Sequence, residues 1–228
     1  MAKILFTHKF SSKHKEELNS AEFEFDSIPF IGTETKDFDV SLVDARQSSA
    51  WIFTSKKAVK SVAKKIDRLT VPEYVFAVGS STNEGLANIG IRGIMPGQFT
   101  AKSLVQKISE YPIDNCTYFH GNMVASDLRK ELKDKNCSVN KIEVYETKFT
   151  PKSVNVQDYD GVVFMSPSAF DSFCKENNLN DLNTVFCIGS TTAEKVSKSY
   201  DRFIVTPDNF TFGDLVKTIN QKYKNVIS

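Results

Sequence analysis

Residues 51–59, WIFTSKKAV, and residues 162–170, VVFMSPSAF, repeat one pattern of an apolar run, a small polar turn and a helical segment, with Ser55 corresponding to Ser166. The apolar runs have the length of buried strands, and the Ser or Thr that follows is a preferred helix N-cap. Apolar residues then recur at helical spacing. This order of strand, turn and helix predicts parallel β-α-β units and therefore layered α/β domains.

Two further pairs of segments keep nearly the same spacing along the chain. Residues 76–82, FAVGSST, correspond to residues 186–192, FCIGSTT, and residues 99–104 correspond to 210–215. Three matches at nearly one offset indicate an internal repeat, and a chain of 228 residues is long enough for two small domains with separate cores. Two weaker pairs are residues 4–8 with 117–120 and residues 25–30 with 142–147.

The turns of the repeat are the expected ligand-binding positions. In parallel sheets, ligands bind beyond the carboxyl ends of the strands, where helix N-termini present unpaired backbone N–H groups. We expect the turns of two domains to face one another across a cleft that binds anions through hydroxyl and N–H groups. For any single turn, plain helix capping is the more frequent alternative. The expected turns are residues 54–55, 79–82, 166–168 and 189–192.

Composition excludes several classes of protein. The formal net charge of +1 lacks the basic excess of a nucleic-acid binder. No apolar run approaches the roughly 20 residues of a membrane-spanning helix, and the N-terminus lacks the pattern of a secretory signal. We therefore expect a cytoplasmic protein that binds neither nucleic acid nor membranes.

Metal and nucleotide chemistry are not expected from the motifs. The cysteines form no C-x-x-C pair, and the three histidines show no metal-ligand spacing. Residues 79–85, GSSTNEG, match neither a G-x-G-x-x-G nor a Walker loop. We expect reduced thiols and no cofactor. The cysteines are Cys116, Cys137, Cys174 and Cys187.

Tyr145 is the candidate acid of the sequence. It lies in residues 142–147, IEVYET, whose alternation is typical of a strand, and most strand tyrosines are packing residues. Its phenol is nonetheless a competent weak acid if it points into a site. No Ser/His/Asp arrangement is evident, because His120, which we take to be the only histidine beside a turn, lacks an evident partner.

The chain resembles the uroporphyrinogen-III synthase family in an ordered set of short segments that spans nearly its whole length. The resemblance implies two similar flavodoxin-like or Rossmann-like three-layer α/β domains with parallel sheets, one inserted into the other and joined by a two-stranded linker. Residues 1–33 and 150–228 would form the first domain and residues 36–147 the second. This arrangement shifts the repeat circularly, so element order fits it and a split near the middle equally well. The segments are 53–59, 78–82, 120–122 with Leu128 and Leu132, 144–147, 164–168, 188–193 and 211–215.

The resemblance also implies a reaction. Members of the family convert hydroxymethylbilane to uroporphyrinogen III in haem biosynthesis, losing water and inverting ring D, without a cofactor. The substrate carries eight carboxylates, which gives a chemical reason for a cleft lined with N–H and hydroxyl groups. The implied protein is a monomeric hydro-lyase, and a transient hand-over of substrate from the preceding pathway enzyme is a further expectation.

Site residues follow from the resemblance by motif. Tyr145 corresponds to a tyrosine proposed to help the hydroxyl leave, Thr192 to a functionally sensitive threonine and Ser166 to a serine in the facing turn, so these three are the expected catalytic residues. Where the family often has an arginine this chain has Ala125, and either Arg129 or Lys130 compensates or the contact is missing. The expected substrate-binding residues are Thr54, Ser55, Lys57, Gly79, Ser80, Ser81, Gly121, Asn122, Ser168, Gly189, Ser190 and Thr191.

Two other classes of protein remain open from the residues alone. A non-enzymatic two-lobed binding module, similar to periplasmic-type sensor domains, would also have paired α/β lobes and a hydroxyl-rich cleft. Stoichiometric binding without turnover would favour it. A flavodoxin-like electron carrier is the other alternative, and a colourless purified protein would exclude it.

Overall fold

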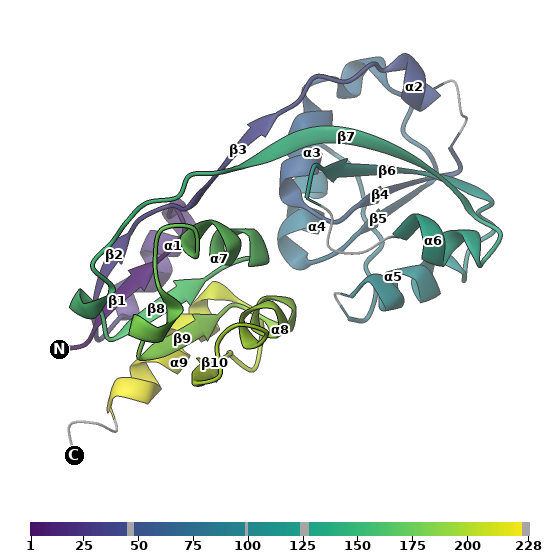
Figure 1. Cartoon of the computed structure of the whole chain (residues 1–228). Helices are drawn as coiled ribbons and strands as arrows, with labels where there is room; N and C mark the ends of the chain where they lie inside the picture. The colour runs from purple at the N-terminus through teal and green to yellow at the C-terminus, as the bar shows by residue number, and fades with distance from the viewer. Residues whose placement is uncertain (45–47, 99, 124–127, 225–228) are drawn as a thin grey trace. The chain divides into compact units, whose positions relative to one another are not determined.

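The chain forms two compact α/β units. The computed structural model describes residues 1–44, 48–98, 100–123 and 128–224. One unit comprises Met1–Gly32 and Lys148–Ser228, and the other comprises Thr33–Thr147, inserted between the two parts of the first (Figure 1). Within the described residues, no helix combines the length and apolar character needed to cross a membrane.

The discontinuous unit is built on a parallel sheet with the strand order β10-β9-β8-β1-β2. In chain order this is the 2-1-3-4-5 arrangement of flavodoxin-like folds. One face packs against α7 and α8, and the other packs against α9 and Leu18, which follows α1. The elements are β1 (Lys3–Phe6), α1 (Ser12–Glu17), β2 (Glu24–Ser27), β8 (Gly161–Phe164), α7 (Pro167–Phe173), β9 (Thr184–Cys187), α8 (Ser190–Ser197), β10 (Phe203–Val205) and α9 (Phe212–Lys224).

The inserted unit has the strand order β3-β7-β6-β4-β5, and a bridge from Phe76 to Ile94 extends its β5 edge. The helices α3 and α4 cover one face, and α5 and α6 cover the other (Figure 1). The elements are β3 (Ile31–Thr35), α2 (Ser41–Asp44), β4 (Ala50–Phe53), α3 (Lys56–Ala63), β5 (Tyr74–Ala77), α4 (Ser80–Ala87), α5 (Ala101–Ile108), β6 (Asn115–Gly121), α6 (Leu128–Lys133) and β7 (Ser138–Phe149).

The two sheets are circular permutations of one pattern. The two sheets have equivalent strands in the same order. In the inserted unit this order is β7-β6-β4-β5 followed by the bridge at Ile94, and in the discontinuous unit it is β2-β1-β8-β9-β10. The weaker sequence pairs therefore align correctly, since residues 4–8 and 117–120 belong to the equivalent strands β1 and β6. This confirms the expected fold class of two similar parallel α/β domains with one inserted into the other.

The connecting strands β3 and β7 pair with each other. The Thr150 N–H donates to the Phe30 carbonyl and the Lys36 N–H donates to the Val144 carbonyl, both at 2.9 Å. Residue numbers therefore rise along one strand as they fall along the other, so the pairing is antiparallel. This pair is the two-stranded linker that the family resemblance implied.

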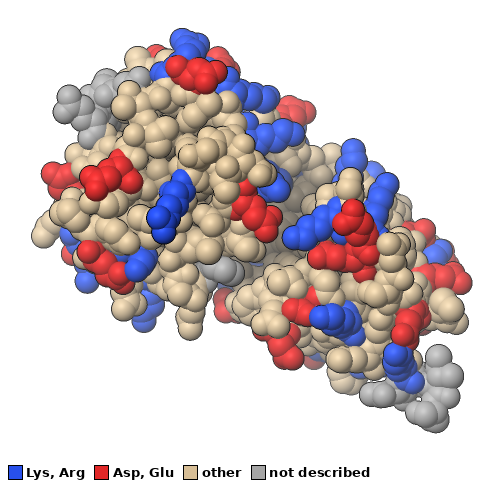
Figure 2. All heavy atoms as spheres, turned by 180° about the vertical axis from the view of Figure 1, so that it is seen from behind, with Lys and Arg blue, Asp and Glu red and all other residues tan. Residues whose placement is uncertain are grey.

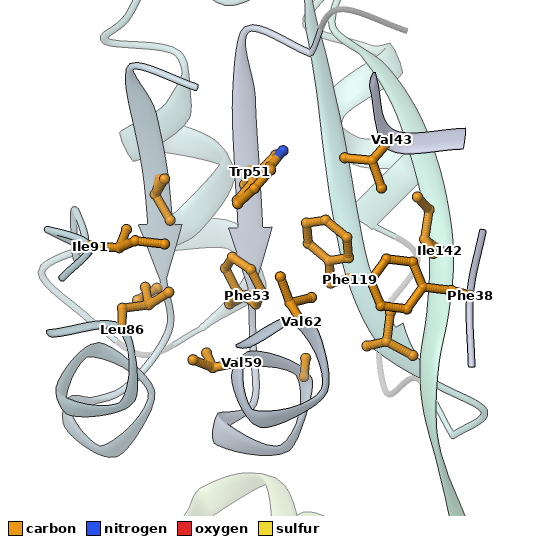
Figure 3. Close-up of a cluster of buried hydrophobic side chains, with 14 residues drawn as sticks. Phe38, Val43, Trp51, Phe53, Val59, Val62, Leu86, Ile91, Phe119 and Ile142 are labelled. Carbon is orange, nitrogen blue, oxygen red and sulfur yellow. The ribbon is translucent and has the colours of Figure 1, made fainter. Parts of the chain in front are cut away.

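Aromatic side chains fill the core of the inserted unit beneath α3 and α4 (Figure 3). The Phe119 ring lies 5.0 Å from the stacked Phe53 ring and 5.3 Å from the edge-on Trp51 ring, between ring centroids. All three are essentially inaccessible to water, and burial of each stabilises the fold by about 1.5 to 3 kcal/mol. The strand ends that carry polar turns are thereby held rigidly.

Candidate functional site

Polar turns follow the carboxyl ends of neighbouring strands in each unit. In the inserted unit, β4 ends before Thr54, β5 ends before the turn at Gly79, and β6 ends at Gly121. These strands are parallel in register, so their carboxyl ends lie at one edge of the sheet. The Thr54 hydroxyl lies 2.9 Å from the Tyr118 hydroxyl, which links the first turn to β6.

Two of the turns cap their helices with a serine side chain. The Ser55 hydroxyl accepts a hydrogen bond from the Lys57 N–H at 3.2 Å, and the Ser166 hydroxyl accepts one from the Ala169 N–H at 3.2 Å. The plain capping role is therefore correct for these two serines. It occupies an acceptor of each hydroxyl and leaves the hydroxyl proton available to a ligand.

The other two helices begin without a side-chain cap. Gly79 precedes α4 and Gly189 precedes α8, and neither can supply a capping oxygen. Among the described residues, no acceptor lies opposite the backbone N–H groups at the first two positions of either helix, and those residues are exposed. Unpaired N–H groups at a helix N-terminus form an anion-binding arrangement. The four residues are Ser80, Ser81, Ser190 and Thr191.

The two glycines of these turns differ in backbone conformation although they correspond in sequence. Gly79 has φ +89°, in a region that L residues rarely adopt, whereas Gly189 is extended with φ −171°. Any residue can take the conformation of Gly189, but a Cβ there would lie 3.2 Å from Cγ of Phe210. The first glycine is required by its dihedral angle, whereas the second is closely approached by an aromatic ring.

We expect Gly79→Ala to destabilise the inserted unit by about 1 to 3 kcal/mol, because alanine is strained at this φ even though no heavy atom lies within 4 Å of its Cβ. Urea unfolding measures the change in the free energy of unfolding. Gly97→Ala is the matched control, since its Cβ also meets nothing within 4 Å and its φ is not in the left-handed range. Equal stabilities of the two variants would contradict the argument.

Tyr145 lies directly beside Gly121. The register pairs His120 with Glu143 but Gly121 with Tyr145, so Val144 is an extra residue that forms a bulge in β7. A Cβ on Gly121 would lie 2.4 Å from Cζ of the Tyr145 ring, so only glycine permits this contact. The half-buried ring therefore stands at the carboxyl edge, near the turn after β6.

Asn122 is engaged by the backbone of β7. Its side-chain amide donates to the Thr147 carbonyl at 3.1 Å, and its side-chain oxygen accepts from the Thr147 N–H at 2.8 Å. The amide thus pairs with Thr147 as a strand residue would, and extends the sheet beyond Gly121. Its main role in this structure is to fix the turn after β6.

The expected catalytic residues of the discontinuous unit differ in exposure. Ser166 is half-buried, and its hydroxyl lies 3.1 Å from that of Ser168, so the two form one polar turn after β8. Thr192 is 3% exposed on the inner side of the first turn of α8, beneath the exposed Ser190 and Thr191. Its position is suited to holding the turn in place.

The basic residues near the turns fall into two groups. Lys57 follows the Ser55 cap, and its side chain is exposed. The protein around the ammonium group nevertheless excludes part of the water and so lowers the pKa of Lys57. Arg129 and Lys130 of α6 line a pocket with Asn115, at the amino end of β6. The structure therefore does not bring Arg129 or Lys130 to the carboxyl-edge turns. Ala125, whose place they were expected to fill, lies outside the described residues.

Sequence reasoning missed the turn after β1. His8 is the second residue after β1, so the prediction that His120 is the only histidine beside a turn was wrong. The His8 ring lies 5.4 Å from the His14 ring, which stacks on Phe212 at 4.3 Å, between centroids. Burial lowers the pKa of His14. The match of residues 4–8 with 117–120 could have identified this turn, because it places a histidine near the carboxyl end of each strand.

The described residues contain no cluster of three or more His, Cys, Asp or Glu side chains that could hold a metal ion. Acidic and basic side chains are interspersed on the face seen in Figure 2, in keeping with the net charge of +1. Any anion must therefore be bound by local hydroxyl, N–H and single basic groups.

Doubly wound sheets with hydroxyl- and amide-bearing turns at their carboxyl edges define a two-unit α/β protein of the class that binds ligands beyond the carboxyl ends of its strands. A family model described as Uroporphyrinogen-III synthase HemD matches residues 12–217. This match covers most of the chain, and the protein belongs to the uroporphyrinogen-III synthase family. No curated protein matches it.

Solved structures agree with the fold. A mutant uroporphyrinogen III synthase from the extremely thermophilic bacterium Thermus thermophilus has a TM-score of 0.68 at 13% identity, covering 99% of this chain and 100% of that one. The uroporphyrinogen-III synthetase of Helicobacter pylori gives 0.66 at 15% identity, covering 97% and 100%. The wild-type Thermus enzyme in a second crystal form gives 0.54 at 13% identity, with 100% of both chains covered. At these identities the likeness establishes the fold.

Proposed function

We propose that this protein converts hydroxymethylbilane to uroporphyrinogen III, losing water, inverting ring D and closing the macrocycle. Membership of the synthase family supports this reaction. The observation on the chain itself that carries the proposal is the pair of uncapped, exposed helix N-termini after Gly79 and Gly189. Each offers N–H groups and hydroxyls to the carboxylates of a polyanionic substrate.

We assign carboxylate binding to the turns of both units. Ser80 and Ser81, with Ser190 and Thr191, offer exposed hydroxyls beside unpaired N–H groups. Thr54, Ser55 and Ser168 add hydroxyls at neighbouring strand ends. Lys57 is the basic group of this set, because its desolvated ammonium gains most from a carboxylate partner. Gly121 and Asn122 shape the turn after β6.

Tyr145 is the residue to which we assign assistance in the departure of the hydroxyl group. Loss of hydroxide from hydroxymethylbilane leaves an azafulvene cation, and a phenol near the leaving oxygen lowers the barrier by donating a hydrogen bond or a proton. The cation then closes to a spiro intermediate, which fragments and recloses with ring D inverted. The glycine at position 121 supports this role, because it lets the phenol ring reach the carboxyl edge.

Ser166 and Thr192 complete the proposal in the discontinuous unit. The Ser166 oxygen caps α7, and we assign its hydroxyl, which lies 3.1 Å from that of Ser168, to substrate binding together with Ser168. Thr192 is a positioning residue, because it is 3% exposed and lies under the turn that carries Ser190 and Thr191. No metal or organic cofactor is assigned a step in this reaction.

The isomer of the product tests the proposal. Purified protein mixed with freshly generated hydroxymethylbilane should yield the type III isomer, measured by chromatography of the oxidised porphyrins. The type I isomer forms spontaneously, so a mixture that contains only type I would overturn the proposal. Stoichiometric binding without turnover would point instead to a binding module.

We also propose that the enzyme acts in the cytoplasm as a monomer and receives its substrate directly from the enzyme that makes it. The four cysteines are free thiols, as is usual in a reducing compartment. Direct transfer would reduce the spontaneous closure of hydroxymethylbilane that gives the type I isomer. Sedimentation of the purified protein tests the monomer.

A further inference from the structure

Two cysteines lie together at the amino end of the sheet in the inserted unit, opposite the edge that carries the functional turns. Cys116 belongs to β6, and Cys137 immediately precedes β7. Their Sγ atoms are 3.7 Å apart, and each thiol also lies within 3.7 Å of the Ser138 carbonyl. None of the proposed steps of the reaction uses either residue.

Local structure fixes Cys137 in this position. Asn136 adopts φ +60°, and the Asn136 and Cys137 N–H groups donate to the carbonyls of Lys133 and Leu132 at 3.0 Å. These two bonds form a Schellman motif that ends α6 and turns the chain back into the sheet. The backbone conformation therefore places the Cys137 thiol beside the Cys116 thiol.

The same two residues line a pocket with cations. The pocket has a volume of about 770 Å³, and Arg129, Lys130 and Lys133 of α6 contribute to its wall. Within the described part of the chain, none of these three side chains forms an ion pair. Positive charge in the wall of the pocket attracts anionic reactants.

We propose that Cys116 and Cys137 are a redox-active dithiol that anionic low-molecular-weight disulfides, such as oxidised glutathione, convert to an intramolecular disulfide. The Cys137 thiolate attacks one sulfur of the small disulfide and releases one glutathione thiolate. The Cys116 sulfur then attacks Cys137 and releases the second. Two protein thiols are oxidised, the small disulfide is reduced to two thiols, and the two protein protons pass to the released thiolates.

The other cysteines provide a contrast within the chain. Burial raises the pKa of Cys174 to about 11 and that of Cys187 to about 12. The contact between the paired thiols lowers the pKa of Cys137 and raises that of Cys116, because one sulfur ionises while the other donates a hydrogen bond to it. Attack by the thiolate therefore starts at Cys137.

Oxidation restrains a segment that matters for the proposed function. A Cys116–Cys137 bond would join the two ends of residues 117–136, which include α6 and the turn that contains Gly121 and Asn122. Since both cysteines are nearly enclosed, at 1% and 3% exposure, the first step requires a local opening at α6. The dithiol should react more slowly than an exposed thiol.

The mass of the protein tests the proposal. Incubation of the full chain with oxidised glutathione should remove two hydrogens from the intact mass, and peptide mapping should link Cys116 to Cys137. Cys116→Ser should instead retain one glutathione at Cys137, because no second thiol displaces it. An unchanged mass, or a link to Cys174 or Cys187, would overturn the proposal. The peptide map of the oxidised wild-type protein tests the proposal even if the serine variant folds poorly.

Charge dependence tests the role of the pocket. Lys130→Gln combined with Lys133→Gln should slow the reaction with oxidised glutathione about tenfold at low ionic strength. The neutral bis(2-hydroxyethyl) disulfide should react with this variant at an unchanged rate. Equal slowing of both reagents would show that the lysines do not attract the disulfide and would contradict this part of the proposal.

Discussion

Replacing Tyr145 by phenylalanine should lower kcat for uroporphyrinogen III formation by about 10² to 10⁴-fold, the range expected for loss of a general acid. The substitution removes only the phenolic oxygen and keeps the ring that packs against Gly121 and the aromatic core. Stability and KM should therefore change little. Steady-state kinetics with product-isomer analysis measure the effect.

Tyr111→Phe is the matched control for this experiment. Tyr111 lies before the amino end of β6, and its ring packs against Tyr74 and Phe76. Loss of its hydroxyl should leave kcat within about twofold. Unchanged kinetics of Tyr145→Phe would remove Tyr145 from the mechanism, and equal losses in both variants would point to a general effect of losing a phenol.

Gly121→Ala should have the second largest effect, because it forces the Tyr145 ring to move. The new Cβ would lie 2.4 Å from two atoms of the ring, well inside van der Waals contact. Overpacking of this kind costs about 1 to 3 kcal/mol, and the displaced phenol should lower kcat nearly as much as Tyr145→Phe does. Urea unfolding and kinetics on the same preparation measure both.

A double variant separates the two consequences of this clash. If Gly121→Ala acts through the phenol, it should add little to the loss of kcat already caused by Tyr145→Phe. Gly32→Ala is the control, since its Cβ would meet its nearest atom, on Thr150, at 4.0 Å. Full additivity of the two losses would show that Gly121 acts on catalysis independently of Tyr145.

Much of the fold could be predicted because its signals are local. The repeated apolar run, polar turn and helical segment at residues 51–59 and 162–170 correspond to β4 with α3 and to β8 with α7. The helix caps at Ser55 and Ser166 follow from residue type alone. Helix ends are less well determined, because the helical spacing of apolar residues continues to Ile66, which lies in a 3-10 turn after α3.

The candidate site was only partly predictable, because equivalent residues in the two repeats differ in backbone conformation and in their contacts. Gly79 and Gly189 match in sequence, yet one has a positive φ and the other an extended backbone. Asn122 looked like a ligand-binding side chain, whereas both ends of its amide pair with Thr147. The turn with His8 was missed, since the short apolar run before it carries no strong turn signal.

The α/β class, the internal repeat and the chemical character of the turns can be predicted from the amino-acid sequence, since these depend on residue type and spacing along the chain. The pairing of β1 with β8 and of β4 with β6 could be read only from the folded structure, because circularly shifted repeats place the same elements in the same order. The position of Tyr145 also depends on the folded structure. One extra residue at Val144 shifts the pairing of β7, and a shift of one residue changes the side of the sheet on which every following side chain falls.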